Sequence, residues 1–131
     1  MQISPTVLEG VRRLIADVLQ LELEEVTAPA LFFDDLGGES IDLIELSFRF
    51  DKEFGVRVRF NDLTADAIEL DEQGRLTAAS LAVLKTRFPF LKLEAFETRP
   101  LQRKTDLLTV EAIAGFVQMA LDAREAAATA K

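Results

Sequence analysis

The segment that most constrains the fold is a helical pattern that opens at a serine. Residues 36–46 read LGGESIDLIEL. Gly37 and Gly38 permit a tight approach and backbone angles that other residues resist, and Ser40 suits the N-cap or the first turn of a helix. We therefore expect an amphipathic helix from about Ser40 to Phe54, with the serine hydroxyl facing solvent where a modifying enzyme can reach it.

This helix carries more apolar residues than one buried face needs. A first set recurs at helical spacing and predicts the buried face: Leu43, Leu46, Phe50 and Phe54. A second set lies further round the helix: Ile41, Ile44 and Phe48. Packing in the core is the ordinary explanation for any one of these, and Ile41 is the exception that we expect to be exposed. Gly55 follows where a left-handed residue ends a helix.

Both ends of the chain also predict a helix. Ser4 as N-cap, with Pro5 at the first helical position, opens one that ends near Gln20. Its apolar stripe is Val7, Val11, Leu14, Ile15 and Val18. Thr109 as N-cap opens the last one. Its stripe is Ile113, Phe116, Val117, Ala120 and Leu121.

We expect one domain over residues 1–124, with two long connections between its helices. Residues 21–38 lose helical periodicity and predict a long loop, whose apolar residues tuck onto the helices: Leu31, Phe32 and Phe33. A second long connection, about 56–106, contains structure of its own. After Arg124 the chain offers no large apolar residue to bury, so residues 125–131 are expected to form a flexible tail.

The 56–106 segment predicts a hairpin followed by a helix. Residues 67–70 and 75–77 flank the turn signal Asp71-Glu72-Gln73-Gly74. This turn lacks the alternating ligands and the closing glutamate of a calcium loop. Thr77 then caps a helix that places Leu81, Leu84 and Phe88 on one face and is closed by Pro89.

Composition excludes several classes of function. The 131 residues carry a net charge of −8, which argues against a nucleic-acid partner and favours basic patches on partner proteins. With no cysteine and no histidine, disulfides, thiolate nucleophiles, common zinc sites and imidazole-based triads are excluded. No apolar run is long enough to span a bilayer, so we expect a cytoplasmic protein. From the residue types present we expect neither a metal site nor catalytic residues.

The motif around Ser40 resembles the attachment site of acyl carrier proteins, in which 4'-phosphopantetheine is esterified to the serine of a Gly-x-Asp-Ser-Leu-Asp pattern. Glu39 stands where the family usually has Asp, which keeps the charge and adds a methylene. The resemblance continues through the following helix at matching apolar, acidic and Phe-Gly positions: Ile41, Asp42, Ile44, Glu45, Leu46, Phe48, Phe50, Glu53, Phe54 and Gly55. It implies an all-α, four-helix bundle of the carrier type, here with a helical or hairpin-plus-helix lobe inserted before the last helix.

The resemblance also implies how the protein is used. Ser40 would receive the arm from coenzyme A through a phosphopantetheinyl transferase, and acyl groups would then be held as thioesters on it. A monomer is expected to meet acyl-processing enzymes such as a ketosynthase, dehydratase or acyltransferase. Its docking residues would be Glu39, Ile41, Asp42, Ile44, Glu45 and Phe48. Arg49 and Lys52 interrupt the acidic face of this helix.

Several interpretations stay open at this point. The insertion favours a specialised carrier for fatty acid, lipid or secondary-metabolite chains. An aminoacyl or peptidyl carrier, or a helical interaction module that is not modified, are the alternatives. Within the insertion, a set of apolar residues would widen the space for an unusual acyl group: Leu81, Leu84, Phe88, Phe90 and Leu91. The competing hypothesis is that the insertion is a docking lobe for a dedicated enzyme.

Overall fold

The structure, a computed structural model, describes residues 2–60, 68–96, 100–101 and 104–129. Helix α1 spans Pro5–Leu19. The Ser4 hydroxyl accepts a hydrogen bond from the Thr6 N–H at 3.2 Å, which satisfies one of the free donors at the start of the helix. Gln20 ends it in a left-handed conformation with a φ of 60°. The predicted first helix and both of its ends are confirmed.

Helix α2 spans Ser40–Phe54, and Gly55 ends it with a φ of 70°. Both limits agree with the sequence prediction. The last turn has a partner that the sequence did not indicate. Arg124 donates hydrogen bonds to the carbonyl oxygens of Phe54, at 2.9 Å, and of Gly55, at 3.2 Å. A cation at this end of a helix also interacts favourably with the helix dipole.

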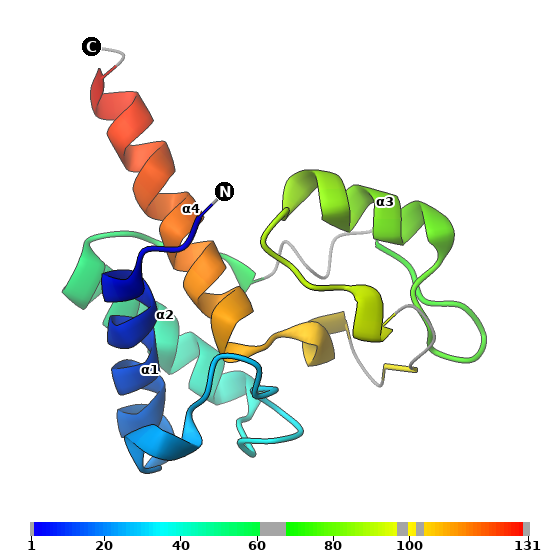
Figure 1. The fold of residues 1–131 in the computed structure, drawn as a ribbon, viewed down its shortest axis with the longest axis horizontal. Coiled ribbons are helices and arrows are strands. Elements are labelled where there is room, and N and C mark those ends of the chain that lie inside the picture. Colours follow the sequence, from blue (N-terminus) through cyan, green and yellow to red (C-terminus); the bar gives the residue numbers. More distant parts are fainter. Residues whose placement is uncertain (1, 61–67, 97–99, 102–103, 130–131) are drawn as a thin grey trace.

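Helix α4 spans Val110–Thr129. Thr109 caps it, because its hydroxyl accepts a hydrogen bond from the Ala112 N–H at 3.0 Å. Of the predicted stripe, Ile113, Phe116 and Val117 are buried and the last two residues are half-buried. The helix then projects beyond its neighbours (Figure 1), and residues 122–128 are exposed. The flexible tail expected for residues 125–131 stays a prediction.

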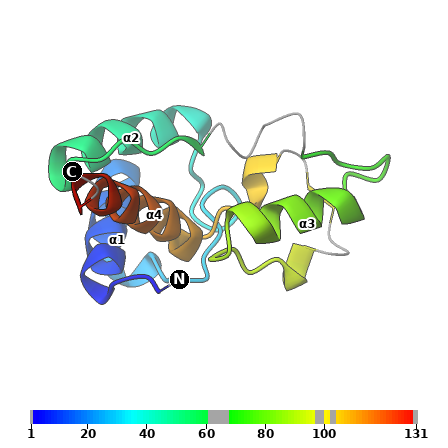
Figure 2. The same cartoon turned by 90° about the horizontal axis from the view of Figure 1, so that it is seen from above.

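Helices α1, α2 and α4, with the loop of residues 21–38, form what we call the carrier region, after the family that the sequence resembles. Helix α1 packs against both α2 and α4, and Figures 1 and 2 show the three together on one side of the molecule. Burial follows the predicted faces. The fully enclosed side chains of those faces are Val11, Ile15, Leu46, Phe50, Ile113 and Val117. Within the described residues the fold has four α-helices and no β-strands, so the predicted all-α class is confirmed.

The loop of residues 21–38 closes one end of this core. It contains a short 3-10 turn at Leu23–Glu25, and Phe32 and Phe33 are buried as predicted. The Phe32 N–H donates to the carbonyl of Leu108 at 2.9 Å, so the loop is tied to the segment that leads into α4.

The inserted segment forms a lobe beside the three helices (Figure 1). Its hairpin is minimal, with one antiparallel bridge between Leu70 and Leu76. The Asp71 side chain accepts hydrogen bonds from the N–H groups of Gln73 and Arg75, both at 2.9 Å. Gly74 has a φ of 82°. The predicted turn is confirmed; residues 61–67 lie outside the described part of the chain.

Helix α3, Ala78–Arg87, is the fourth helix and belongs to this lobe. Thr77 caps it by accepting a hydrogen bond from the Ser80 N–H at 3.1 Å. Leu84 and Phe88 are buried and Leu81 is half-buried, as the predicted face requires. Two 3-10 turns follow, at Glu94–Phe96 and Lys104–Leu107.

Aromatic contacts join the lobe to the carrier region. The ring centroids of Phe88 and Phe90 each lie 5.0 Å from that of Phe116 on α4. A Cβ atom on Gly115 would overlap the Phe90 ring, so only glycine allows this ring to rest on the helix. Phe88 and Phe90, which were expected to widen an apolar space, therefore fill the junction with packed rings.

Among the described residues, no helix is both long and apolar enough to cross a membrane.

Candidate attachment site

Two glycines bring the chain to Ser40 for different physical reasons. Gly37 has a φ of 71°, a left-handed conformation that side chains rarely adopt, and its surroundings are open. Gly38 is buried, and its N–H donates to the carbonyl of Phe32 at 2.9 Å. A Cβ atom at Gly38 would overlap the Phe32 ring. The loop can therefore lie against its own buried phenylalanine only because residue 38 has no side chain.

The start of α2 is capped by the acidic residues on either side of Ser40. The Glu39 side chain accepts a hydrogen bond from the Asp42 N–H, and Asp42 Oδ2 accepts one from the Glu39 N–H at 2.8 Å. This reciprocal capping box makes Glu39 the N-cap. Ser40 is consequently the first helical residue, one of the two positions that the sequence predicted.

The Ser40 side chain is exposed and is not used in capping. It borders an open hollow of about 600 Å³, lined by Phe33, Gly37, Gly38, Glu39, Ser40 and Ile41. The positive end of the helix dipole lies at this point and favours a phosphate group, and the open hollow leaves room for one. A phosphodiester on the serine oxygen therefore fits the site.

The outward face of α2 is apolar. The exposed fractions of Ile41, Ile44 and Phe48 are 69%, 58% and 69%. The exposure of Ile41 agrees with the prediction. For Ile44 and Phe48, core packing, the ordinary expectation for an apolar residue, is wrong, and their exposure agrees with the docking positions that the resemblance implies. The reason is geometric: α1 packs against α2, and the residues of α2 that are buried are Leu43, Leu46 and Phe50. We call Ile41, Ile44 and Phe48 the apolar stripe.

Charged groups border the stripe near Ser40. Glu39 and Glu45 are exposed and Asp42 is half-buried. Arg49, which was expected to interrupt the acidic face, binds Asp17 of α1 at 2.7 Å and Glu45 at 3.2 Å. Hydrogen bonds to these two carboxylates, that of Asp17 first, raise the pKa of Arg49 above its usual value. The arginine therefore joins α2 to α1, and its charge is compensated.

A basic edge, formed by Arg57 and Arg59 in the segment that follows α2, was not predicted from the sequence. Residues 55–60 run back alongside α2 (Figure 2) with Val56, Val58 and Phe60 buried. The intervening Arg57 and Arg59 are exposed, and within the described residues neither has a carboxylate partner. The alternation of apolar and basic residues over 56–60 was the signal, because side chains alternate between two faces of an extended segment.

No group of acidic residues in the described ranges is arranged to hold a metal ion. Asp71 serves its own turn instead. Hydrogen bonds from backbone N–H groups, led by that of Arg75, lower the pKa of the Asp71 carboxyl. The interpretation of this segment as a turn, rather than a calcium loop, agrees with that geometry.

Comparison with known proteins gives the same family as the motif. Residues 9–69 match the family model described as "Phosphopantetheine attachment site". The chain is 44% identical over 57 residues to polyketide-8 synthase acyl carrier protein 2 of Streptomyces avermitilis, a match that covers 44% of this chain and 66% of that relative.

Two further relatives are matched over more of their length. Acyl carrier proteins of Sinorhizobium fredii and Rhizobium meliloti are each 42% identical over 60 residues, covering 46% of this chain and 74% of theirs. The chain therefore belongs to the acyl carrier protein family, whose members are carriers and not catalysts and whose cofactor is covalently attached 4'-phosphopantetheine.

Proposed function

We propose that Ser40 Oγ is the attachment atom and that the chain holds acyl groups as thioesters. The observation that carries this is an exposed hydroxyl on the first residue of α2, left out of the capping box. In the loading step, Ser40 Oγ bonds to the pantetheine-side phosphorus of coenzyme A. The pyrophosphate P–O bond breaks, adenosine 3',5'-bisphosphate leaves, and the hydroxyl proton passes to the transferase or solvent.

The residues around Ser40 have positioning roles in this proposal. Glu39 and Asp42 hold the first turn of α2, so the backbone of Ser40 is fixed at the border of the open hollow. The positive end of the α2 dipole favours the phosphodiester anion. When bound, the arm supplies the terminal thiol that carries the cargo; the protein supplies the anchor and the recognition surface.

The docking surface that we propose is the apolar stripe with its acidic neighbours Glu39, Asp42 and Glu45. Exposed apolar residues gathered in one place mark sites of protein contact, and charge complementarity raises the rate and specificity of encounter. A transferase and acyl-processing enzymes such as a ketosynthase, dehydratase or acyltransferase are the partners. Arg57 and Arg59 add a requirement, because a well-matched partner should carry acidic groups along that edge.

For the cargo, we propose the acyl chains of a specialised pathway. The relative from Streptomyces avermitilis is named as a carrier of a polyketide synthase, which supports secondary metabolism. The inserted lobe also supports a specialised carrier, because a carrier for ordinary acyl chains would not need this additional segment. We place the protein in the cytoplasm because loading consumes coenzyme A.

The test is incubation with coenzyme A and a broad-specificity phosphopantetheinyl transferase, followed by intact-mass spectrometry. The wild-type chain should gain one phosphopantetheine, and Ser40→Ala should gain none. Ser47→Ala, on the same helix, is the matched control and should be modified normally. An unchanged mass with every transferase tried would favour the competing function, a helical interaction module that is not modified.

A further inference from the structure

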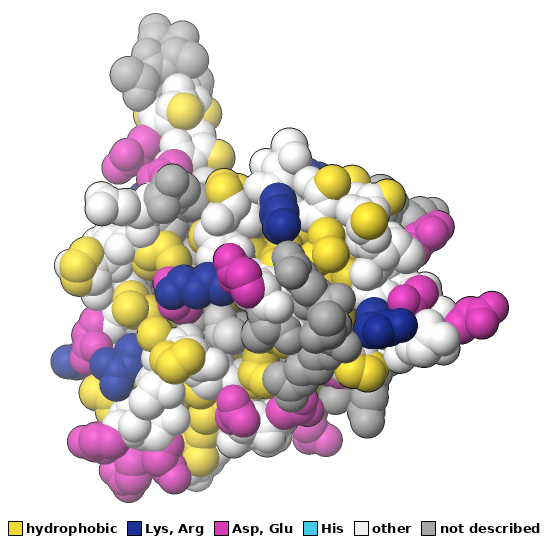
Figure 3. All heavy atoms as spheres, turned by 45° about the vertical axis from the view of Figure 1, so that its right-hand side comes forward, with side chains coloured by type: hydrophobic (Ala, Val, Ile, Leu, Met, Phe, Trp, Pro, Cys, Tyr) yellow, Lys and Arg dark blue, Asp and Glu magenta, His cyan; other side chains and the backbone are white. Residues whose placement is uncertain are grey.

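A groove lies where the inserted lobe meets the carrier region. Its volume is about 370 Å³, and its lining comes from three parts of the chain. The 21–38 loop supplies Pro29, Leu31 and Asp35; the lobe supplies Lys92 and Phe96; the start of α4 supplies Thr109 and Glu111. The groove therefore exists only because the insertion packs beside the loop. Figure 3, which brings the lobe side forward, shows basic, acidic and apolar side chains mixed on that face of the molecule.

The lining combines an apolar base with polar groups. Leu31 and Phe96 are only 7% and 4% exposed, so they form the base. Lys92 Nζ lies 3.2 Å from Glu111 Oε2, and this ion pair links the lobe to α4. The Lys92 side chain is 74% exposed. Because an ammonium group has three donors and Glu111 accepts from one, two remain for oxygen atoms of a ligand.

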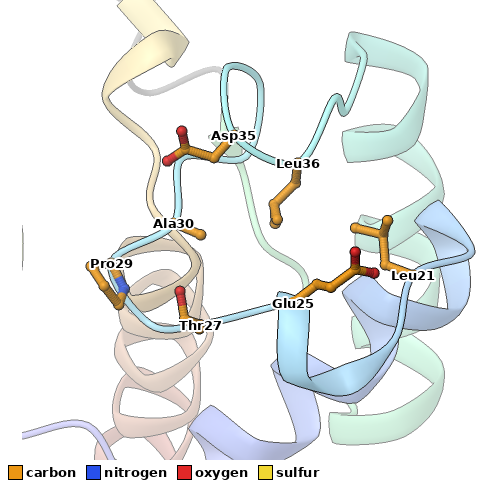
Figure 4. A pocket seen from close by; sticks show the side chains of 7 residues that line it. All are labelled: Leu21, Glu25, Thr27, Pro29, Ala30, Asp35 and Leu36. Atoms are coloured by element: carbon orange, nitrogen blue, oxygen red, sulfur yellow. The ribbon is translucent and has the colours of Figure 1, made fainter.

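A second hollow, within the 21–38 loop, has a different chemistry. Figure 4 shows the side chains of Leu21, Glu25 and Leu36 directed into it. Its charged lining is acidic, and both carboxylates already accept backbone hydrogen bonds: Glu25 from the Glu22 N–H and Asp35 from the Leu31 N–H. It offers no cation to a ligand, whereas the groove at the lobe does.

The groove lies within reach of an arm on Ser40. Gly38, two residues before the serine, is hydrogen bonded to Phe32. The residue before Phe32 in the chain is Leu31, which lies in the groove base. The path from Leu31 to Phe32, across the hydrogen bond to Gly38 and along the chain to Ser40 is short. Successive Cα atoms are about 3.8 Å apart, so Leu31 and Ser40 lie within ~17 Å of one another. An extended phosphopantetheine arm is about as long as five or six residues of extended chain, ~17–20 Å.

We propose that this groove is a resting site for the acyl end of the arm and that it favours chains with a hydroxyl or keto oxygen. The inference rests on the proposed attachment at Ser40. The apolar part of the chain lies on Leu31 and Phe96, and its oxygen accepts a hydrogen bond from the Lys92 ammonium. The insertion thus selects cargo at its border with the carrier region, and not through a space among its own phenylalanines.

The test compares two cargoes on two variants. The protein is loaded with octanoyl or 3-hydroxyoctanoyl phosphopantetheine from the coenzyme A thioesters, and loading is verified by intact mass. Backbone amide NMR shifts of Leu31, Lys92 and Thr109 report groove occupancy, and Val11 in α1 is the reference. Lys92→Met removes the donor at an exposed position, while Lys85→Met removes a lysine charge from α3 as the matched control.

We expect both chains to shift the groove amides, and the hydroxylated chain to shift them more. Lys92→Met should lower the bound-to-free ratio of the hydroxylated chain about threefold, the effect of one modest hydrogen bond, and leave octanoyl unchanged. Lys85→Met should alter neither. Loaded protein without shifts at the groove, or equal behaviour of the two variants, would overturn the inference.

A failure of the attachment proposal is distinguishable from a failure of the groove. If the mass shows no loading, free 3-hydroxyoctanoyl pantetheine is titrated against the same amides. Shifts that Lys92→Met weakens would support the groove without the anchor. An unperturbed spectrum at millimolar ligand would overturn the groove as well.

Discussion

Phe48 and Phe90 illustrate how the two regions of this molecule use the same kind of residue in opposite ways. Phe48 stands on the outward face of α2 with 69% of its surface exposed, whereas Phe90 is 8% exposed and rests on Gly115 and Phe116 of α4. The carrier region keeps apolar surface outward, on the face that we propose for docking. The lobe directs its phenylalanines inward and becomes part of the core. An insertion packed in this way is an integral part of the fold.

The largest effect that we predict tests this contrast between an exposed and a buried phenylalanine directly. Phe90→Ala should lower the free energy of unfolding by about 3 kcal/mol, because it leaves a cavity between the lobe and α4. Phe48→Ala should change it by less than ~0.5 kcal/mol, because the ring is exposed. Urea unfolding of both variants measures the difference. Equal losses would show that the lobe is not anchored through Phe90.

A second prediction compares two glycines that each lie under a phenylalanine ring. Gly38→Ala should cost about 2 kcal/mol, because its Cβ overlaps the buried Phe32 ring. It should also slow the modification of Ser40, since the loop that precedes the serine must shift. Gly115→Ala meets Phe90 in the same way but gains about 1 kcal/mol of helix propensity.

Gly115→Ala should therefore be destabilised less than Gly38→Ala and be modified at the wild-type rate. Urea unfolding gives the stabilities, and the time course of intact mass gives the rates. A Gly38→Ala protein modified as fast as wild type would show that the conformation of this loop does not affect the attachment reaction.

A third prediction concerns the link between α4 and the end of α2. Arg124→Met should cost about 1 kcal/mol, because the carbonyls of Phe54 and Gly55 lose their donor. Arg13→Met is the control. It removes only an exposed ion pair with Glu9 and should cost less than ~0.5 kcal/mol. Thermal unfolding of the two variants should separate them, and equal melting temperatures would count against the cap.

The smallest effect is expected in the lobe turn and depends on pH. The pKa of Asp71 is lowered in the folded protein, first by the Arg75 N–H. The ionised carboxylate therefore adds stability above the unfolded pKa of about 4, and this is lost as pH falls through the folded pKa. Asp71→Asn should lower the melting temperature at pH 7 more than at pH 3. A difference that does not change with pH would argue against this linkage.

Much of the site could be predicted from local sequence, because the signals act over a few residues. Ser4, Thr77 and Thr109 cap their helices as expected, and Gly55 ends α2. The exposure of Ser40 was predicted as well. What sequence analysis missed were contacts between distant segments: Arg49 with Asp17, Arg124 with the end of α2, and the groove at Lys92.

The sequence by itself determined where the helices begin and end, which residue offers a free hydroxyl, and which family the chain resembles. Capping, periodicity and glycine conformation are properties of neighbouring residues, so they can be recognised along the chain. Helical periodicity left open which way Ile44 and Phe48 face, and the resemblance placed them on a docking surface; only the tertiary structure decided that the phenylalanines of the insertion face α4. Burial depends on which elements cover a given face, and that is set by packing among segments far apart in the sequence.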